Sequence, residues 1–351
     1  MMRRKTHNVF VGDVGVGSDH KVTVQSMTNT DTKNKEATIN QIKELEAVGC
    51  DIVRIAVPDM EAAIAVEQIK KAINIPLVAD IHFDYRLAIE CVKNGIDALR
   101  INPGNIGSKE RVLEVIKACK YHNVPIRIGV NSGSVKKEYL QKYNGVNVDS
   151  LVESALEHVR ILEENNFYDT VISVKSSDVR LCVESYRKIA KETQYPLHIG
   201  VTETGTVFNG TIKSSIGIGS LLLDGIGDTI RVSLTGDPVE EVMVGKQILR
   251  ATGILNDEVD IISCPTCGRT QIDLISIATE VENRLKSLHK PLKVAVMGCV
   301  VNGPGEAKEA DYGLAGGKGE GIIFKKGKIV KKVKEESLVD ELIETINRDL
   351  L

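Results

Sequence analysis

The sequence predicts an α/β protein, a (β/α)8 TIM barrel followed by a small α+β module. Three observations support this prediction. A unit made of a short β-branched run, a polar loop and an amphipathic helix repeats from Val22 to about Gly253. Eight such units fill about 230 residues, close to the usual size of this barrel. After Gly253 the pattern changes, and the chain contains three cysteines, Cys264, Cys267 and Cys299.

The barrel strands are located by their apolar runs. No Gly-x-Gly-x-x-Gly motif follows the first run, which makes a doubly wound open sheet the weaker alternative. The widest step includes the polar segment 131–149, a loop at the catalytic face that could act as a lid. Residues 9–16 and the segment from Lys21 are predicted to form a hairpin that turns at Gly17-Ser18-Asp19 and closes the barrel floor. The strands are predicted to begin near Val22, Asp51, Pro76, Asp97, Pro125, Thr170, Leu197 and Thr229.

The C-terminal module has its own predicted elements. They are a strand over 260–263, a helix over 271–288, a strand over 292–298, a glycine-rich segment over 312–321, a hairpin over 322–334 turning at 326–328, and a helix over 336–351. The hairpin lysines at 325, 326, 328, 331, 332 and 334 could dock an acidic electron donor or simply protect a solvated sheet edge. We therefore predict two domains, a TIM-barrel substrate-binding domain over 1–255 and a second domain over 260–351.

Composition argues against several classes of function. The formal net charge of −3 gives no general electrostatic reason to bind nucleic acid or an anionic membrane. Hydrophobic residues make up 42%, enough for a buried core. No apolar run approaches the roughly 20 residues that span a bilayer. The basic N-terminus lacks the apolar stretch of a signal peptide. A cytoplasmic location is expected, because free thiolates persist in a reducing compartment.

The three cysteines near the C-terminus predict a metal centre. Cys264 and Cys267 share a Pro/Gly loop, and Cys299 ends an apolar run. Three thiolates leave one iron of a cubane cluster without a cysteine, and Glu306 follows across a Gly-Pro-Gly turn. The set favours one [4Fe-4S] cluster per chain, bound by Cys264, Cys267, Cys299 and Glu306. Zinc with the nearby His289, or simple packing of the thiols, are the alternatives. Buried, inert thiols are expected at Cys50, Cys91, Cys119 and Cys182.

Polar residues at the ends of apolar strands predict a site at the carboxyl face of the barrel. The set contains five cations but only two carboxylates, Asp80 and Glu203. Unpaired buried charges are costly, so an anion must complete the site, and guanidinium groups suit a diphosphate. The alternative, a structural ion-pair network, is short of carboxylates. Asp80 and Glu203 are the proton-transfer candidates. The set comprises Arg54, Asp80, His82, Arg100, Asn102, Arg127, Asn131, Lys175, Glu203, Arg231 and Ser233.

The link between the two domains predicts a dimer. Each barrel helix returns the chain to the floor of the barrel, so the last helix ends far from the catalytic face. The connection 253–259 can span at most about 25 Å when extended, so the cluster can barely reach the mouth of its own barrel. We expect a closed two-fold homodimer in which the cluster domain of one chain caps the barrel of the other.

The motifs of both halves resemble the 4-hydroxy-3-methylbut-2-enyl diphosphate synthase family in its short bacterial form. The likeness covers nearly the whole chain, and the two cysteine motifs are highly specific. The motifs are Val53-Arg-Ile-Ala-Val-Pro58, Asp80-Ile-His82, Leu99-Arg-Ile-Asn-Pro-Gly-Asn105, Arg127-Ile-Gly-Val-Asn131, Gly200-Val-Thr-Glu203, Cys264-Pro-Thr-Cys-Gly-Arg269 and Met297-Gly-Cys-Val-Val-Asn-Gly-Pro-Gly-Glu306.

The resemblance implies a reductive ring opening in the non-mevalonate isoprenoid pathway. The substrate would be 2-C-methyl-D-erythritol 2,4-cyclodiphosphate, and the electrons would come from reduced flavodoxin or ferredoxin. By similarity, Asp80, Asn131 and Glu203 would lie around the carbon skeleton, with Glu203 as the acid for the departing oxygen. The substrate-binding candidates are Arg54, His82, Arg100, Arg127, Lys175 and Ser233 by similarity, Arg231 from its strand position, and Asn302 from the second cysteine motif.

Two other classes of function remain as alternatives at this stage. One is a barrel lyase or transferase for a phosphorylated substrate, with a purely structural metal module. The other is a non-catalytic cluster carrier or redox sensor, which leaves the cationic barrel mouth unexplained.

Overall fold

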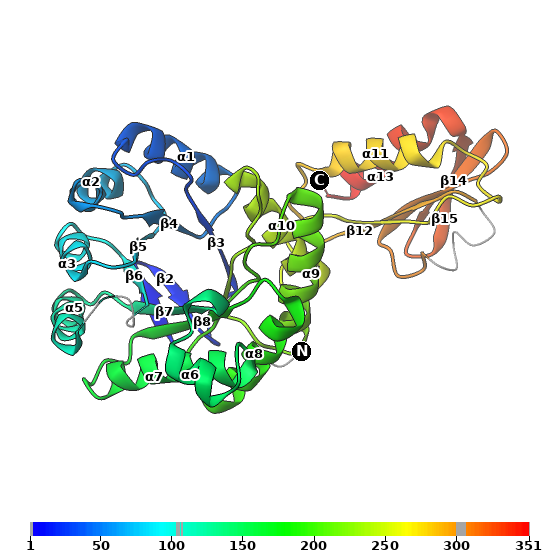
Figure 1. Ribbon diagram of the computed structural model, residues 1–351. Helices are drawn as coiled ribbons and strands as arrows, with labels where there is room; N and C mark the ends of the chain where they lie inside the picture. Colours follow the sequence, from blue (N-terminus) through cyan, green and yellow to red (C-terminus); the bar gives the residue numbers. More distant parts are fainter. Residues whose placement is uncertain (1–2, 103–105, 107, 300–306, 351) are drawn as a thin grey trace. The chain divides into compact units, whose positions relative to one another are not determined.

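The chain folds into two compact units, Met1–Ile254 and Leu255–Leu351. The computed structural model describes residues 3–102, 106, 108–299 and 307–350 (Figure 1). None of the helices within these ranges is long and apolar enough to cross a membrane.

The first unit is a parallel eight-stranded sheet wrapped into a barrel, as predicted. Its strands follow the order β8-β7-β6-β5-β4-β3-β10-β9, and a parallel bridge between Ile172 and Leu197 joins its two edges. The predicted starts of all eight strands agree with the structure to within one residue. The strands are β3 (Thr23–Met27), β4 (Ile52–Ala56), β5 (Leu77–Ile81), β6 (Ala98–Ile101), β7 (Ile126–Asn131), β8 (Thr170–Lys175), β9 (His198–Ile199) and β10 (Thr229–Ile230).

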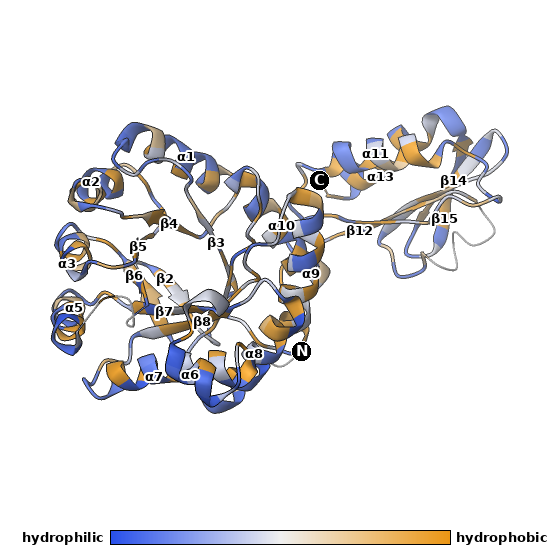
Figure 2. Ribbon diagram, viewed as in Figure 1, coloured by the Kyte–Doolittle hydropathy of each residue, from blue (hydrophilic) through white to orange (hydrophobic). Residues whose placement is uncertain are grey.

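Helices surround these strands (Figure 1), and they carry both hydrophobic and hydrophilic residues (Figure 2). Many of their apolar side chains are buried, among them Ile42, Val66 and Leu151. Several begin at an Asp or Asn whose side chain accepts a backbone N–H of the first turn, as Asp59, Asn147 and Asp178 do. The helices are α1 (Lys35–Ala47), α2 (Met60–Lys71), α3 (Tyr85–Lys93), α5 (Lys109–His122), α7 (Val148–Glu163), α8 (Val179–Glu192), α9 (Val207–Leu223) and α10 (Pro238–Ala251). The long loop after β7 carries η1 (Ser132–Ser134) and α6 (Lys137–Lys142).

A side chain helps to close the barrel where β8 meets β9. The Tyr186 hydroxyl, from α8, accepts the N–H of Val174 at 3.2 Å and donates to the carbonyl of His198 at 2.7 Å. Tyr186 is fully buried. Its phenol therefore joins two strands that share few direct backbone contacts.

An N-terminal hairpin closes the barrel floor, but its turn differs from the predicted one. β1 (Val9–Val11) pairs with β2 (Val14–Val16), so the chain turns at Gly12-Asp13 and not at residues 17–19. The φ of +60° at Gly12 explains why the tight turn forms there. The apolar side chains of the hairpin pack on Ile52, Val78, Ala98 and Val171 near the starts of barrel strands.

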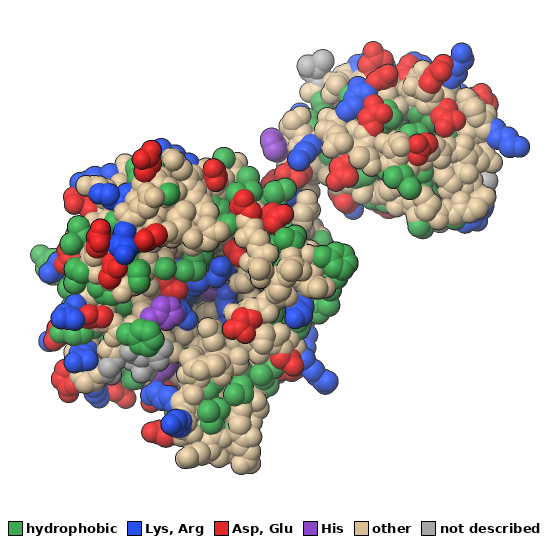
Figure 3. All heavy atoms as spheres, turned by 45° about the horizontal axis from the view of Figure 1, so that its top comes forward, with side chains coloured by type: hydrophobic (Ala, Val, Ile, Leu, Met, Phe, Trp, Pro, Cys, Tyr) green, Lys and Arg blue, Asp and Glu red, His purple; other side chains and the backbone are tan. Residues whose placement is uncertain are grey.

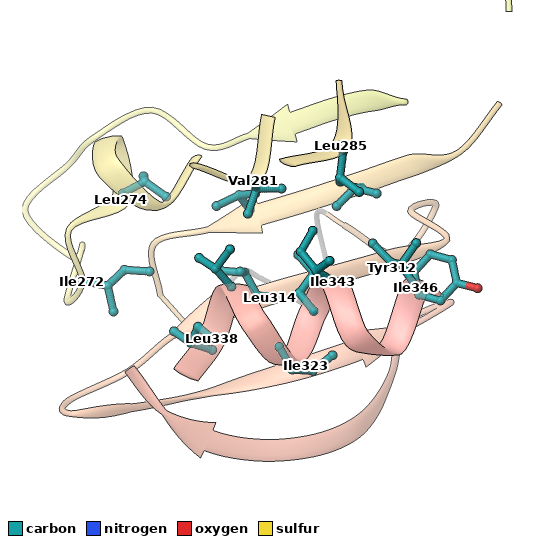
Figure 4. Packing of buried hydrophobic residues seen from close by; sticks show 14 residues of the cluster. Ile272, Leu274, Val281, Leu285, Tyr312, Leu314, Ile323, Leu338, Ile343 and Ile346 are labelled. Carbon is teal, nitrogen blue, oxygen red and sulfur yellow. The ribbon is translucent and has the colours of Figure 1, made fainter. Parts of the chain in front are cut away.

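The second unit is a five-stranded mixed sheet in the order β11-β12-β13-β14-β15. The strands β11, β12 and β13 run parallel, whereas β14 and β15 pair antiparallel. Side chains from α11 and α13 pack against the sheet in one apolar core (Figure 4). The elements are β11 (Asp260–Ser263), α11 (Leu274–Leu285), β12 (Lys293–Met297), β13 (Tyr312–Gly316), β14 (Glu320–Lys325), β15 (Lys328–Lys334), η2 (Glu335–Ser337) and α13 (Leu338–Leu350).

The lysine-rich hairpin is formed by β14 and β15, with its turn where the sequence predicts it. Four of its lysines pair with carboxylates of the same unit: Lys325 with Asp349 at 2.7 Å, Lys331 with Glu341 at 2.6 Å, Lys332 with Glu320, and Lys334 with Glu336 at 3.9 Å. These pairs favour the solvated-edge interpretation over the docking one.

Candidate functional site

The predicted cations converge inside the barrel. Arg54 lies on β4, Arg100 on β6, Arg127 on β7 and Lys175 on β8. The strand register places Asp80 of β5 beside Arg100, and Arg100 beside Arg127. Arg100, Arg127 and Lys175 are each less than a tenth exposed. Figure 3 looks into a hollow of this unit in which basic side chains lie beside a histidine.

Asp80 is a central anion of this cluster. Its carboxylate lies 3.0 Å from Arg100 Nη1, 3.6 Å from Arg54 Nε and 3.6 Å from His82 Nε2. Burial alone would raise the pKa of Asp80, but Arg54, the His82 hydrogen bond and Arg100 together hold it well below its usual value. Asp80 is therefore ionised at neutral pH and suited to holding the two arginines.

The same crowding acts on the cations. Burial lowers the pKa of Arg54 to about 9, with Arg231 and Arg100 adding to the effect and Asp80 opposing it. For Arg127, burial and then Arg54 and Arg100 lower the pKa well below the ordinary arginine value. An anionic ligand bound beside these two arginines would thus stabilise the protonated form of each guanidinium.

Arg127 has few protein partners. It donates to the side-chain oxygen of Gln25, while its Nε and Nη2 are buried without a hydrogen-bond partner in the described structure. Such orphaned donors indicate a place where an acceptor from a ligand or a water belongs.

Arg231 is paired with a residue that sequence reasoning missed. Both carboxylate oxygens of Glu241, on α10, lie 3.4 Å from Arg231 Nη2. Glu241 also accepts from Ser26 Oγ at 3.0 Å and from the Leu234 N–H at 3.0 Å. Glu241 is therefore a buried carboxylate next to the cation cluster. Nothing in the sequence around it indicates this position, which becomes apparent only in the folded structure.

The other predicted residues lie in the loops after the strands. Glu203 is exposed, and its φ of +53° is a conformation that non-glycine residues seldom adopt outside constrained sites. The loops of Glu203 and Ser233 are joined, because Thr204 Oγ1 donates to the Ser233 carbonyl and Thr235 N–H to the Gly205 carbonyl at 2.9 Å. Asn131 is partly buried at the end of β7, Asn102 is buried after β6, and His82 is half exposed.

The cysteines of the second unit follow two adjacent parallel strands. β11 and β12 pair in register up to Ser263 and Val296, so Cys264, Cys267 and Cys299 all follow the same edge of the sheet. The Gly298 N–H lies 3.2 Å from Cys264 Sγ and donates to it. Hydrogen bonds from the backbone and then the side chain of Arg269 lower the pKa of the exposed Cys267 thiol.

These features fit a thiolate-bound metal cluster. Donors aimed at sulfur stabilise a thiolate and tune a cluster that it binds. Within the described ranges no group of three or more side chains is already arranged to hold a metal ion. The fourth predicted ligand, Glu306, and the substrate candidate Asn302 lie outside the described residues.

The remaining four cysteines are buried in the barrel unit, as predicted. Burial raises the pKa of Cys50, Cys91 and Cys119 to about 12 and that of Cys182 to about 11. They are therefore protonated and unreactive near neutral pH, in contrast to Cys267.

Comparison with known proteins adds three findings. Residues 6–246 match the family model of the GcpE TIM-barrel domain, and residues 260–348 that of the GcpE protein C-terminal domain. Proteins of Clostridium acetobutylicum (67% identical over 347 residues) and Clostridium perfringens (66% over 346 residues) cover 99% of both chains. Both are named 4-hydroxy-3-methylbut-2-en-1-yl diphosphate synthase (flavodoxin). A crystal structure of 7,8-dihydropteroate synthase from Vibrio fischeri has a TM-score of 0.50 at 12% identity, covering 70% of this chain and 98% of that one, a likeness of fold alone.

Proposed function

Because the chain belongs to the GcpE family, we propose that it catalyses the reductive ring opening of 2-C-methyl-D-erythritol 2,4-cyclodiphosphate to (E)-4-hydroxy-3-methylbut-2-enyl diphosphate. It is an oxidoreductase of isoprenoid biosynthesis that takes its electrons from flavodoxin, the donor in the names of its relatives, or from ferredoxin. Two electrons and two protons enter, and one water leaves. The observation that carries the proposal is the convergence of five cations on a barrel interior with two buried carboxylates, Asp80 and Glu241.

The barrel residues bind and orient the substrate. Arg127 and Lys175 have no carboxylate partner among the described residues, so they are the strongest candidates to bind the diphosphate, while Asp80 holds Arg54 and Arg100 in place. His82, Arg231 and Ser233 complete the cradle. Forked donors from several strands fix both phosphates and thereby orient the ring.

Proton delivery falls to Glu203. It is an exposed carboxylate in a strained loop that is tied to the Ser233 loop, whereas Asp80 is held ionised and is a poor acid. Asn131 lies beside Lys175 in the strand register and can orient the carbon skeleton. Glu203 donates the proton that converts the departing oxygen into water.

One [4Fe-4S] cluster per chain completes the enzyme. We assign Cys264, Cys267, Cys299 and Glu306 as its ligands, supported by the three thiols after adjacent strands and by the N–H donated to Cys264. When bound, this cluster supplies single electrons and a Lewis-acidic iron. The free state of all seven cysteines agrees with a reducing, cytoplasmic location.

An anaerobic assay tests the function. Purified protein with the cyclodiphosphate and reduced flavodoxin should form the linear allylic diphosphate, and the EPR spectrum of the reduced protein should change when the cyclodiphosphate is added. A colourless, zinc-loaded protein without turnover would instead support a barrel lyase or transferase with a structural metal. Iron loading without binding of the cyclodiphosphate would support a cluster carrier.

The proposed enzyme is a homodimer in which each cluster domain caps the barrel of the other chain. The support is the connection between α10 and β11, too short to bring the cluster easily to its own barrel mouth. A mixture of Cys299→Ser and Glu203→Gln chains should then recover about a quarter of wild-type activity, because half of the dimers are mixed and each has one intact site. A mixture no more active than the single variants contradicts the shared site.

A further inference from the structure

Lys175, a proposed diphosphate ligand, lies against His198 in a buried pair, and the proposed function gives His198 and this contact no role. Lys175 is 8% exposed and His198 is fully buried, and Lys175 Nζ lies 3.5 Å from His198 Nε2. The other ring nitrogen of His198, Nδ1, is buried without a hydrogen-bond partner in the described structure. Neither residue has a carboxylate partner among the described residues.

The surroundings of the pair are strongly cationic. The charges of Arg54 on β4, Arg127 on β7 and Arg231 after β10 act on both Lys175 and His198 and lower the pKa of each. Two titratable groups of α8 also lie beside the pair, the Cys182 thiol, which is directed at the Gly200 carbonyl at 3.4 Å, and the Tyr186 phenol, which donates to the His198 carbonyl at 2.7 Å. Burial raises the pKa of both, so both are neutral near neutral pH. Two carboxylates lie close to these arginines, Asp80 beside Arg54 and Glu241 beside Arg231. Within the described residues neither of them, nor any other carboxylate, forms an ion pair with Lys175 or His198.

Lysine and arginine respond differently to a buried, cationic environment such as this one. A guanidinium stays protonated in proteins, whereas a buried ammonium can lose its proton. Burial, then the neighbouring cations, lower the pKa of Lys175 and of His198 well below their ordinary values. An anion bound among these groups acts in the opposite direction, because it stabilises the ammonium form of Lys175.

We infer that the Lys175–His198 pair takes up a proton from solvent when the anionic substrate enters the barrel, so that binding and protonation of the protein are coupled. The amine Nζ of Lys175 receives the proton, and the neutral imidazole of His198 accepts a hydrogen bond from the resulting ammonium. This inference rests on the proposed function, because it names the cyclodiphosphate as the anion. Lys175 is then charged only when the substrate is bound, and it is neutral in the empty site.

Calorimetry of the oxidised holoenzyme, without reductant, tests the coupling. The cyclodiphosphate is titrated into the protein near neutral pH in buffers that differ in ionisation enthalpy. Each phosphorus of this cyclic diphosphate has one ester bond and one anhydride bond and therefore a single, strongly acidic hydroxyl that is ionised near neutral pH, so a proton taken up belongs to the protein. We expect an uptake of about one proton per site and an affinity that falls up to about tenfold for each unit rise in pH.

The variants separate Lys175 from other groups. Lys175→Arg, which is permanently charged, and Lys175→Gln, which is never charged, should both lose the proton uptake, whereas the exposed control Lys117→Arg should retain it. Binding by the wild type without buffer-dependent heat overturns the coupling while leaving the proposed function intact, as does undiminished uptake in both Lys175 variants. Failure of the wild type to bind the cyclodiphosphate overturns the proposed function and this inference together.

Discussion

Replacing Cys267 by serine should remove the iron and lower the activity by about 100-fold or more, since even supporting groups around a metal site are worth 10- to 100-fold. Cys267 is exposed on the loop after β11, and its thiolate is already stabilised by hydrogen bonds from Arg269. Serine is a much weaker iron ligand than a thiolate. Iron and acid-labile sulfide content, together with the visible absorption of the anaerobically purified variant, measure the loss.

The matched control is Cys119→Ala, a change at a buried thiol of the barrel unit. It should keep the full iron content, because the pKa of about 12 at Cys119 leaves no thiolate for a metal near neutral pH. Glu306→Ala should keep part of the cluster but lose its stability toward oxygen. Full iron content in Cys267→Ser would exclude Cys267 as a ligand.

Substituting Asp80 by asparagine should destabilise the protein by about 3–5 kcal/mol, the usual cost of removing one partner of a buried ion pair. Two arginines, Arg54 and Arg100, would lose the carboxylate that lies 3.6 and 3.0 Å from them. KM for the cyclodiphosphate should rise as well, because both guanidinium groups lose their fixed positions. Urea unfolding followed by circular dichroism measures the first effect.

The control for Asp80 is Glu114→Gln, an exposed carboxylate on α5, which should change stability by no more than about 0.5 kcal/mol. The Asp80 contribution also has a defined pH dependence. Because the folded-state pKa is depressed, the stabilisation is complete above the unfolded value of about 3.9 and is lost as pH falls through the folded-state pKa. The difference between wild type and Asp80→Asn should therefore shrink in strong acid. A variant as stable as wild type at neutral pH would contradict this role of Asp80.

The barrel could be predicted from the sequence because its strands are short, mostly apolar and β-branched runs that are largely buried and recur at regular intervals. The strand β13 could not, since Tyr312–Gly316 reads as a glycine-rich segment. The structure supplies the reason for its glycines: a Cβ at Gly313 would lie 2.2 Å from the Phe324 ring, and one at Gly316 would lie 2.6 Å from Ile272. These glycines serve close packing of side chains and not a turn.

The site was only partly predictable for a related reason. Polar residues at the ends of apolar strands were visible in the sequence, which identified Arg54, Arg100 and Lys175. Gln25 and His198 are also polar residues within the barrel strands, but they lie earlier in β3 and β9 than the strand-end positions at which a site is expected. Glu241 carries no such signal, since an acidic residue in the first turn of a helix is ordinary and only the fold directs it at Arg231.

The phenol of Tyr186 links the position of one outer helix, α8, to two strands that carry residues of the proposed binding site. Lys175 is on β8 and His198 on β9, the two strands that this hydroxyl joins, so a change in the packing of α8 should alter the distance between them. The strands β8 and β9 are thus linked to α8 through a single side chain. A substitution on α8 that moves Tyr186 should therefore perturb Lys175 and His198 in the barrel interior, although it lies outside the barrel wall.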